Sequence, residues 1–178
     1  MIFKNNKIKN LKLIKPKPFK DKRGLFRRIF CEKEFKRQKL NHRIKQANVS
    51  ENKYKFTLRG FHYQLSPFAE DKTITCIKGS IYDIVVDLRV NSKSYMKWCS
   101  FMINEKNRHL IHIPKGCANA FLTLENNTIV QYNSSQFYKP DFERGIRFND
   151  PAFNFKWPHK PRIISSKDLS HLNYVLKK

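Results

Sequence analysis

One short segment gathers three side chains that can do chemistry together. Within residues 58–72, Arg59 and Lys72 carry positive charge, and His62 carries a ring that gains or loses a proton near neutral pH. A guanidinium and an ammonium suit an anionic substrate, while an imidazole suits proton transfer. Because His62 stands between Phe61 and Tyr63, these residues alone also allow a hydrogen-bonded histidine in a cavity wall. The rest of the chain has to distinguish the two interpretations.

The elements that must position these side chains are predicted to be strands. Short runs rich in β-branched residues alternate with turn residues along the middle of the chain. The turn at Gly79 predicts a hairpin between the strands before and after it, and the turn at Gly116 predicts another. This pattern is typical of an all-β sandwich or barrel. The predicted strands cover residues 73–78, 81–89, 110–113, 120–124 and 128–132.

Helices are few in the pattern, and no linker divides it. Only residues 32–39 and 167–172 suit short helices, the second capped by Ser165 or Ser166. A chain of 178 residues suits one domain, which at this size buries roughly 70% of its unfolded-chain surface. We therefore expect a single domain over residues 1–178.

Composition excludes several classes of protein. The net charge of +23 predicts attraction to polyanions, but the lysines are scattered rather than gathered in a basic stripe, so we expect no specific nucleic-acid partner. No apolar run reaches the length of a signal peptide or membrane span, so we expect a cytoplasmic protein without membrane contact. The cysteines form no CxxC pair, which favours free thiols over disulfides or zinc; they are Cys31, Cys76, Cys99 and Cys117.

Several motifs, taken in order, point to a known family. They are 21–24 with Phe26, 46–50, 58–64, Lys72 with Gly79, 83–89, 113–121, 132–140, 145–151, 157–158 and 166–168. Together they resemble the dTDP-4-dehydrorhamnose 3,5-epimerase family over about residues 18–170. The resemblance implies a jelly roll of the cupin type. It also implies an isomerase that inverts C3 and C5 of a nucleotide-linked 4-keto-6-deoxyhexose, in deoxysugar biosynthesis for surface polysaccharide or lipopolysaccharide.

The resemblance implies four catalytic roles. His62 is the base, Asp168 orients it, Tyr132 returns a proton from the opposite face, and Lys72 stabilises the oxyanion at C4. These residue types suit those tasks, because hydrogens beside a ketone need a base, an acid across the ring and a cation near the enolate. From the residues alone, Asp168 also suits a helix start, Tyr132 a packing aromatic and Lys72 a surface lysine.

The resemblance also implies the groups that hold the substrate. Arg23 and Arg59 are expected to bind the diphosphate through paired, charge-assisted hydrogen bonds. Gln46 and Asn48 are expected beside the nucleotide and sugar, although both also suit a strand edge. The remaining substrate-binding residues implied are Phe26, Asn119, Tyr138 and Lys167, of which Tyr138 is also a second phenol that could serve as the acid.

Some positions depart from the family pattern. Asn119 stands where the typical enzymes have a histidine, and Ala120 stands where they have a glycine. Arg28 stands where an acidic residue is usual. Because asparagine cannot titrate and Arg28 reverses a charge, these changes put the identity of the substrate in question.

No cofactor and no metal are expected. A cupin metal site needs two histidines one residue apart, but Gln64 occupies the second position after His62. His109 and His112 are three apart in a predicted strand, which points them to opposite faces.

Other functions and the assembly stay open. One alternative is a single-carbon epimerase or ketoisomerase acting on a related nucleotide sugar, including a heptose. Another is a sugar-binding jelly roll without catalysis. The resemblance implies a homodimer with an exchanged N-terminal strand, for which Leu11, Leu13 and Ile14 offer apolar side chains.

Overall fold

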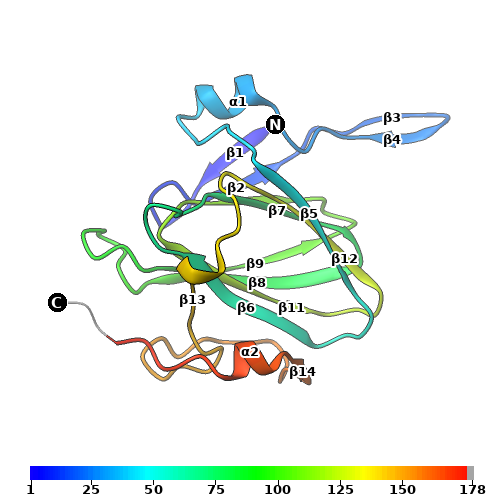
Figure 1. The fold of residues 1–178 in the computed structure, drawn as a ribbon. Coiled ribbons are helices and arrows are strands. Elements are labelled where there is room, and N and C mark those ends of the chain that lie inside the picture. Colours follow the sequence, from blue (N-terminus) through cyan, green and yellow to red (C-terminus); the bar gives the residue numbers. More distant parts are fainter. Residues whose placement is uncertain (176–178) are drawn as a thin grey trace.

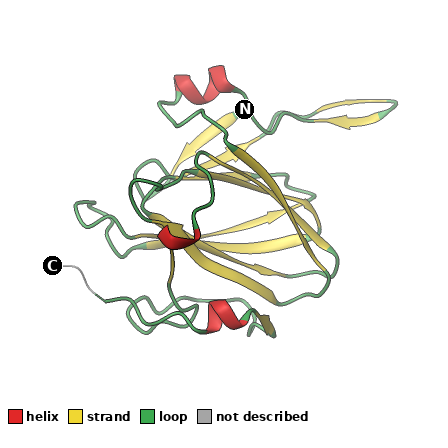
Figure 2. Ribbon diagram, in the orientation of Figure 1, coloured by secondary structure: helices red, strands yellow, loops and turns green. Residues whose placement is uncertain are grey.

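Two β-sheets packed face to face form the body of the protein (Figures 1 and 2). This computed structural model describes residues 1–175, so the last three residues of the expected domain, 176–178, lie outside the described residues. The all-β prediction is confirmed. The strands are β1 (Ile2–Asn5), β2 (Lys12–Lys15), β3 (Phe19–Asp21), β4 (Gly24–Phe26), β5 (Gln46–Asn52), β6 (Thr57–Gln64), β7 (Lys72–Lys78), β8 (Ser80–Asp87), β9 (Trp98–Asn104), β10 (Leu110–Ile113), β11 (Cys117–Thr123), β12 (Thr128–Ser134), β13 (Glu143–Gly145) and β14 (Ile163–Ile164).

The strand order decides which residues can meet. The first sheet runs β1-β2-β10-β7-β12-β5, and the second runs β13-β6-β11-β8-β9, with β14 pairing in parallel beside β6. Strands β3 and β4 form a separate ribbon that projects away from the body (Figure 1). Side chains of β7 and β12 therefore face those of β6 and β11 across the space between the two sheets.

The sequence of strand β8 is almost continuously apolar because both faces of the strand are covered. On its inner face, Ile81 and Val85 belong to the main core between the sheets. On its outer face, Ile84 and Val86 pack against Phe153 from the C-terminal segment. A strand covered on both faces needs apolar residues at nearly every position, so simple alternation is lost.

The two predicted hairpins are wrong, although their strands are right. Strand β7 pairs with β10 and β12, whereas β8 pairs with β11 and β9. The turn at Gly79 thus carries the chain from one sheet to the other, and the turn at Gly116 does the same between β10 and β11. Local pattern reports an extended segment and a turn but not the partner of a strand, which is set by the packing of both sheets.

Short helices occupy the predicted places. Helix α1 spans Glu32–Arg37 and α2 spans Ser166–Leu169, each shorter than expected, and a 3-10 turn, η1, spans Pro140–Phe142. Ser165 caps α2, since its side-chain oxygen accepts a hydrogen bond from the Asp168 backbone at 3.1 Å. Over residues 1–175, no helix has the length and apolar character needed to cross a membrane.

The apolar residues near the N-terminus belong to their own core. Strand β2 pairs with β1 and β10 of the same chain, and both Leu11 and Ile14 are fully buried there. The expected exchange of an N-terminal strand between two chains stays a prediction. The β3–β4 ribbon carries exposed apolar side chains, of which Phe19 and Phe26 are 62% and 70% exposed.

A β-bulge in β6 changes which way its side chains face. Asn119 lies opposite His62, and Phe121 lies opposite Arg59. Strand β6 therefore advances three residues where β11 advances two, which leaves one extra residue in β6. The extra residue falls beside Gly60, whose φ of +112° disfavours any other residue. A Cβ at Gly60 would also lie 2.5 Å from the Asn119 carbonyl oxygen. Glycine is required here for both reasons.

Replacing Gly60 by alanine is expected to cost more stability than the same change at Gly24. Both residues have a positive φ, but a Cβ at Gly24 meets nothing within 4 Å. Gly24→Ala should lower the free energy of unfolding by about 1 kcal/mol through backbone strain alone, and Gly60→Ala by about 3 kcal/mol through strain plus overlap. Urea unfolding of both variants measures the difference, and equal losses would contradict the steric argument.

Candidate active site

An open cavity of about 660 Å³ lies between the two sheets. A smaller cavity of about 350 Å³ adjoins it. His62, Lys72 and Tyr132 line both cavities, so they mark the point where the two meet. The structure thus brings together three of the four side chains expected to be catalytic, and the fourth, Asp168, lines the larger cavity.

The bulge in β6 explains how Arg59 and His62 share one cavity. In a regular strand, residues three apart point to opposite faces. The extra residue beside Gly60 restores them to the same face, and both side chains line the larger cavity. This is the local feature that turns the sequence spacing into a site.

His62 and Asp168 form the central contact of the site. The His62 Nε2 atom lies 2.7 Å from Asp168 Oδ1, and the Gly60 backbone donates to Asp168 Oδ2 at 3.1 Å. Burial would raise the pKa of the Asp168 carboxyl, but hydrogen bonds from His62 and Gly60 outweigh it and hold that pKa below its usual value. Asp168 is therefore a buried carboxylate that fixes one ring nitrogen of His62, leaving the other for a substrate.

Helix α2 places this carboxylate. Strand β14 pairs with β6 through Ile164 and Leu58, and the Ser165 cap follows immediately. This pairing anchors the start of α2 beside β6, which brings Asp168 to a strand more than a hundred residues earlier in the chain. Sequence pattern alone suits a helix-start acid at this position; the fold makes the same residue the partner of His62.

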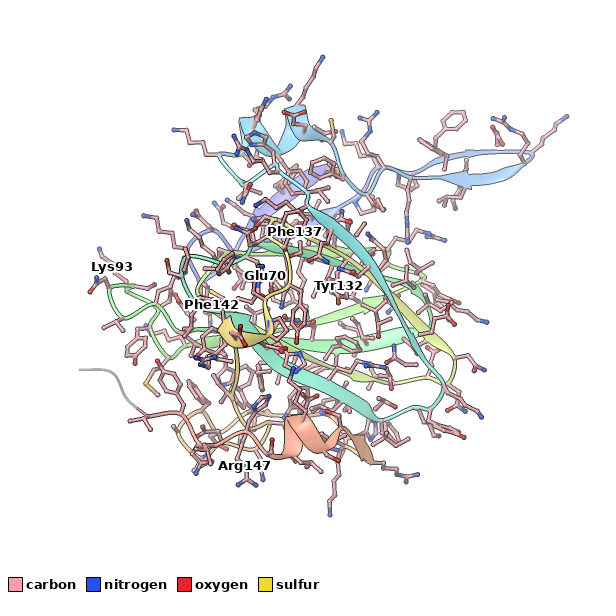
Figure 3. The ribbon with its side chains drawn as sticks, viewed as in Figure 1. Glu70, Lys93, Tyr132, Phe137, Phe142 and Arg147 are labelled. Atoms are coloured by element: carbon pink, nitrogen blue, oxygen red, sulfur yellow. The ribbon has the colours of Figure 1, made fainter. Side chains whose placement is uncertain are left out.

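Tyr132 and Lys72 face His62 from the opposite sheet. Tyr132 lies on β12 and Lys72 at the start of the neighbouring β7. Lys72 Nζ lies 3.0 Å from Glu70 Oε1, and the other Glu70 oxygen accepts from Ser134. Figure 3 shows Glu70 and Tyr132 between the sheets. Burial raises the pKa of Tyr132, and the charge of Glu70 raises it further, so the phenol stays protonated well into the alkaline range.

The smaller cavity collects several of the expected substrate-binding residues. Gln46, Asn48 and Tyr138 line it. Gln46 Oε1 accepts a hydrogen bond from the Tyr138 backbone at 2.6 Å, and the Tyr138 hydroxyl donates to Glu143 Oε2 at 2.6 Å. Lys167, which lines the larger cavity, pairs with the same carboxylate. Glu143 thus joins the walls of the two cavities.

Arg59 and Asn119 line the larger cavity as expected. Arg59 Nε donates to Asn52 Oδ1 at 2.8 Å, and Asn119 Nδ2 donates to Asp83 Oδ2 at 3.2 Å. Asp83 is fully buried, and among the described residues its Oδ1 has no hydrogen-bond partner. Burial raises the pKa of Asp83 well above its usual value, against the hydrogen bond from Asn119.

Arg23 and Phe26 are not brought to this cavity within the chain. Both lie on the β3–β4 ribbon, which points away from the sheets (Figure 1). The Arg23 side chain is 87% exposed and pairs with Asp21 at 2.5 Å. Arg28, after the ribbon, pairs with Glu34 of α1 at 3.3 Å and lines neither cavity. A role of these residues in a site requires a second chain.

Sequence reasoning missed four groups around the site: Glu70, Asp83, Glu143 and His171. Glu70 carried a signal, because it stands two residues before Lys72 and so faces the same side of an extended segment. Glu143 and Asp83 gave no local signal beyond being acids in a basic chain. His171 stands three residues after Asp168, a spacing that matters only because a helical turn joins them.

Among residues 1–175, one cluster of side chains could hold a metal ion; it consists of His62, Asp168 and His171. Their ligand atoms lie within 4.8 Å of one another. However, ligands of one tetrahedral zinc ion stay roughly 3.3 Å apart, given Zn–N distances of about 2.0–2.1 Å. The 2.7 Å separation of His62 and Asp168 is that of a hydrogen bond. We therefore interpret the cluster as a hydrogen-bonded group, and the expected absence of a metal stays a prediction.

The facing sheets and the cavity between them define a jelly-roll protein of the cupin type. The chain belongs to the dTDP-4-dehydrorhamnose 3,5-epimerase family, whose profile matches residues 5–175. The resemblance inferred from the motifs is thus confirmed.

Relatives and solved structures agree over nearly the whole chain. The dTDP-4-dehydrorhamnose 3,5-epimerase of Sinorhizobium fredii is 36% identical over 171 residues, covering 96% of this chain and 88% of the relative. The Bacillus anthracis enzyme of that name, solved with TDP and pyrophosphate bound, has a TM-score of 0.94 at 32% identity, covering 97% and 99% of the two chains. A Legionella pneumophila 3,5-epimerase in complex with dTDP-4-keto-L-rhamnose has a TM-score of 0.90 at 31% identity, covering 96% and 90%.

Removing the charge of Glu70 is expected to ease ionisation of Tyr132. Because that charge contributes to the raised pKa of Tyr132, Glu70→Gln should lower this pKa. Tyrosinate absorbance titrated against pH, with the Tyr132→Phe curve subtracted, isolates the phenol. Glu51→Gln is the matched control, since Glu51 lines the larger cavity but is not among the charges acting on Tyr132. An unchanged or raised pKa in Glu70→Gln would contradict the assignment.

Proposed function

We propose that this protein inverts C3 and C5 of a dTDP-linked 4-keto-6-deoxyhexose, the reaction for which its relatives are named. One observation carries the proposal. His62 and Tyr132 come from facing sheets and line the same cavities, so a sugar between them meets a base on one face and an acid on the other. That arrangement is what inversion at carbon requires.

Each step uses groups of this chain. The C4 ketone acidifies the neighbouring C–H bonds, and the His62 ring nitrogen not held by Asp168 removes the proton. The electron pair moves onto the C4 oxygen, where the Lys72 ammonium stabilises the developing charge. The Tyr132 hydroxyl then delivers a proton to the carbon from the opposite face. No bond between two heavy atoms is cleaved and nothing is oxidised, so exchange of protons with solvent only has to reset His62 and Tyr132.

The remaining residues are proposed to hold the substrate. Arg59 and Lys167 lie on the wall of the larger cavity and suit the diphosphate, while Gln46, Asn48 and Tyr138 surround the smaller cavity. Asn119 lies opposite His62 in the strand register and offers an uncharged amide to a sugar hydroxyl. We propose a cytoplasmic role in deoxysugar biosynthesis and a single domain over residues 1–178, because both sheets contribute to one core.

Solvent exchange tests the chemistry directly. In heavy water with dTDP-4-keto-6-deoxyglucose, the protein should incorporate deuterium at both C3 and C5, read by mass spectrometry and NMR. His62→Asn should reduce this incorporation about 10²–10⁴-fold while leaving dTDP binding intact. His109→Asn is the matched control, since His109 does not line either cavity.

The possible outcomes separate the functions left open by the sequence. Deuterium at one carbon only would indicate a single-carbon epimerase, and exchange retained in His62→Asn would remove His62 from the mechanism. No exchange with any 4-keto sugar nucleotide, together with binding, would favour a sugar-binding protein.

We also propose a homodimer in which the β3–β4 ribbon of each chain reaches the cavity of its partner. The support is the exposure of Phe19 and Phe26 and the distance of Arg23 from its own site. Large apolar side chains exposed on a projecting ribbon are a poor surface unless something covers them. The partner's cavity offers a substrate whose diphosphate suits the Arg23 guanidinium.

Mixing two inactive variants tests this exchange. Arg23→Ala and His62→Asn dimers should each show low activity. In a mixed dimer, one site receives both lesions and the other receives neither, so random mixing should restore roughly a quarter of wild-type activity. Mixing His62→Asn with Asp168→Asn is the control, because both lesions lie in the same chain's site and each mixed site keeps one of them. Recovery in the control, or none with Arg23→Ala, would contradict the exchange.

A further inference from the structure

His171 lies behind the His62–Asp168 pair and has no function in the proposed reaction. Its Nε2 atom is buried and has no hydrogen-bond partner among residues 1–175. That atom lies 3.8 Å from Asp168 Oδ1, the same oxygen that holds His62. The two imidazole rings meet edge to face, with centroids 6.0 Å apart and planes at 78°. One carboxylate oxygen is thus flanked by two histidines.

Gly145 creates the space for this second ring. Strand β13 pairs with β6 so that Gly145 lies opposite His62. A Cβ at Gly145 would overlap the imidazole of His171. The missing side chain beside His62 therefore lets His171 pack closely against the back of the pair. A ring seated so tightly is held in place by the backbone and is not a loosely packed surface group.

Burial of His171 favours its neutral form. Burial lowers its pKa, and the neighbouring charge of His62 lowers it further, as does that of Lys167; Asp168 and Glu143 act in the opposite direction. A neutral imidazole carries one N–H, and a nitrogen that faces a carboxylate oxygen is stabilised as the donor. Asp168 Oδ1 has a second lone pair for such a donor, because an ionised carboxylate oxygen accepts more than one hydrogen bond.

We propose that His171 is a positioning residue that moderates the basicity of His62 through the shared Asp168 oxygen. The inference rests on the proposed role of His62 as base. An N–H of His171 directed at Asp168 offsets part of the negative charge of that carboxylate. This charge otherwise stabilises the imidazolium of His62. The imidazolium of His62 is then stabilised less than it would be by Asp168 alone. The distance of 3.8 Å between His171 Nε2 and Asp168 Oδ1 is longer than a hydrogen bond, so the effect is moderate. The hydrogen bond between His62 and Asp168 is kept.

The test compares two substitutions at His171 in the full-length protein. His171→Phe removes the donor, whereas His171→Gln keeps an N–H at similar reach. In His171→Phe, the titration midpoint of the His62 ring signals in ¹⁵N NMR should rise by about 0.5 pH unit, a change worth about 0.7 kcal/mol. The acid limb of the pH profile of kcat/KM should move by the same amount. His171→Gln should restore both values to those of the wild type.

Gly145→Ala provides a second route, because it displaces the ring without changing His171 itself. It should shift the His62 midpoint in the same direction as His171→Phe. Equal midpoints in wild type, His171→Phe and His171→Gln, with intact circular dichroism, would show that His171 only fills space and would overturn the proposal. The NMR readout needs no substrate, so it gives its answer even where the epimerase assay fails.

Discussion

The hydrogen bond between His62 and Asp168 is the contact on which the site depends. It joins β6, in the middle of the second sheet, to a one-turn helix near the C-terminus. A helix of four residues has little stability of its own. It is held by the Ser165 cap, by β14 beside β6, and by the buried carboxylate, which also accepts from the Gly60 backbone. The same bonds that orient His62 therefore also hold helix α2 in place.

Most basic side chains of the site are paired with an acidic side chain. The chain has 37 basic but only 14 acidic residues, and several acids lie beside the groups expected to meet substrate. Glu70 pairs with Lys72, Glu143 with Lys167, and Asp168 with His62. Arg59 donates to the amide oxygen of Asn52 and has no carboxylate partner among residues 1–175. Its charge is therefore less compensated than those of the two lysines, which suits it to hold the most anionic part of a nucleotide sugar.

Strands β7, β8, β10, β11 and β12 and the two short helices could be predicted from the sequence, because β-branched runs, turn glycines and a serine cap are local signals. The other strands, among them β6 with His62, were not predicted. Strand partners could not be predicted either. The turns at Gly79 and Gly116 look like hairpin turns, and only the packing of two sheets sends the chain across. The pairing of His62 with Asp168 came from motif resemblance, since no local feature links residues so far apart. Glu143 and His171 were missed because their importance arises from a third element, β13, which places Gly145 against His62.

The group directly opposite His62 in the strand register is the uncharged amide of Asn119, which donates to the buried Asp83. The facing sheet carries Lys72 and Tyr132. Enolate charge is stabilised where a cation stands, so the C4 oxygen should lie toward Lys72. A charged group in place of Asn119 would compete for that oxygen from the other side. With an amide there, Lys72 is the cation that the proposed reaction assigns to the ketone, while Arg59 is proposed to hold the diphosphate in the same cavity.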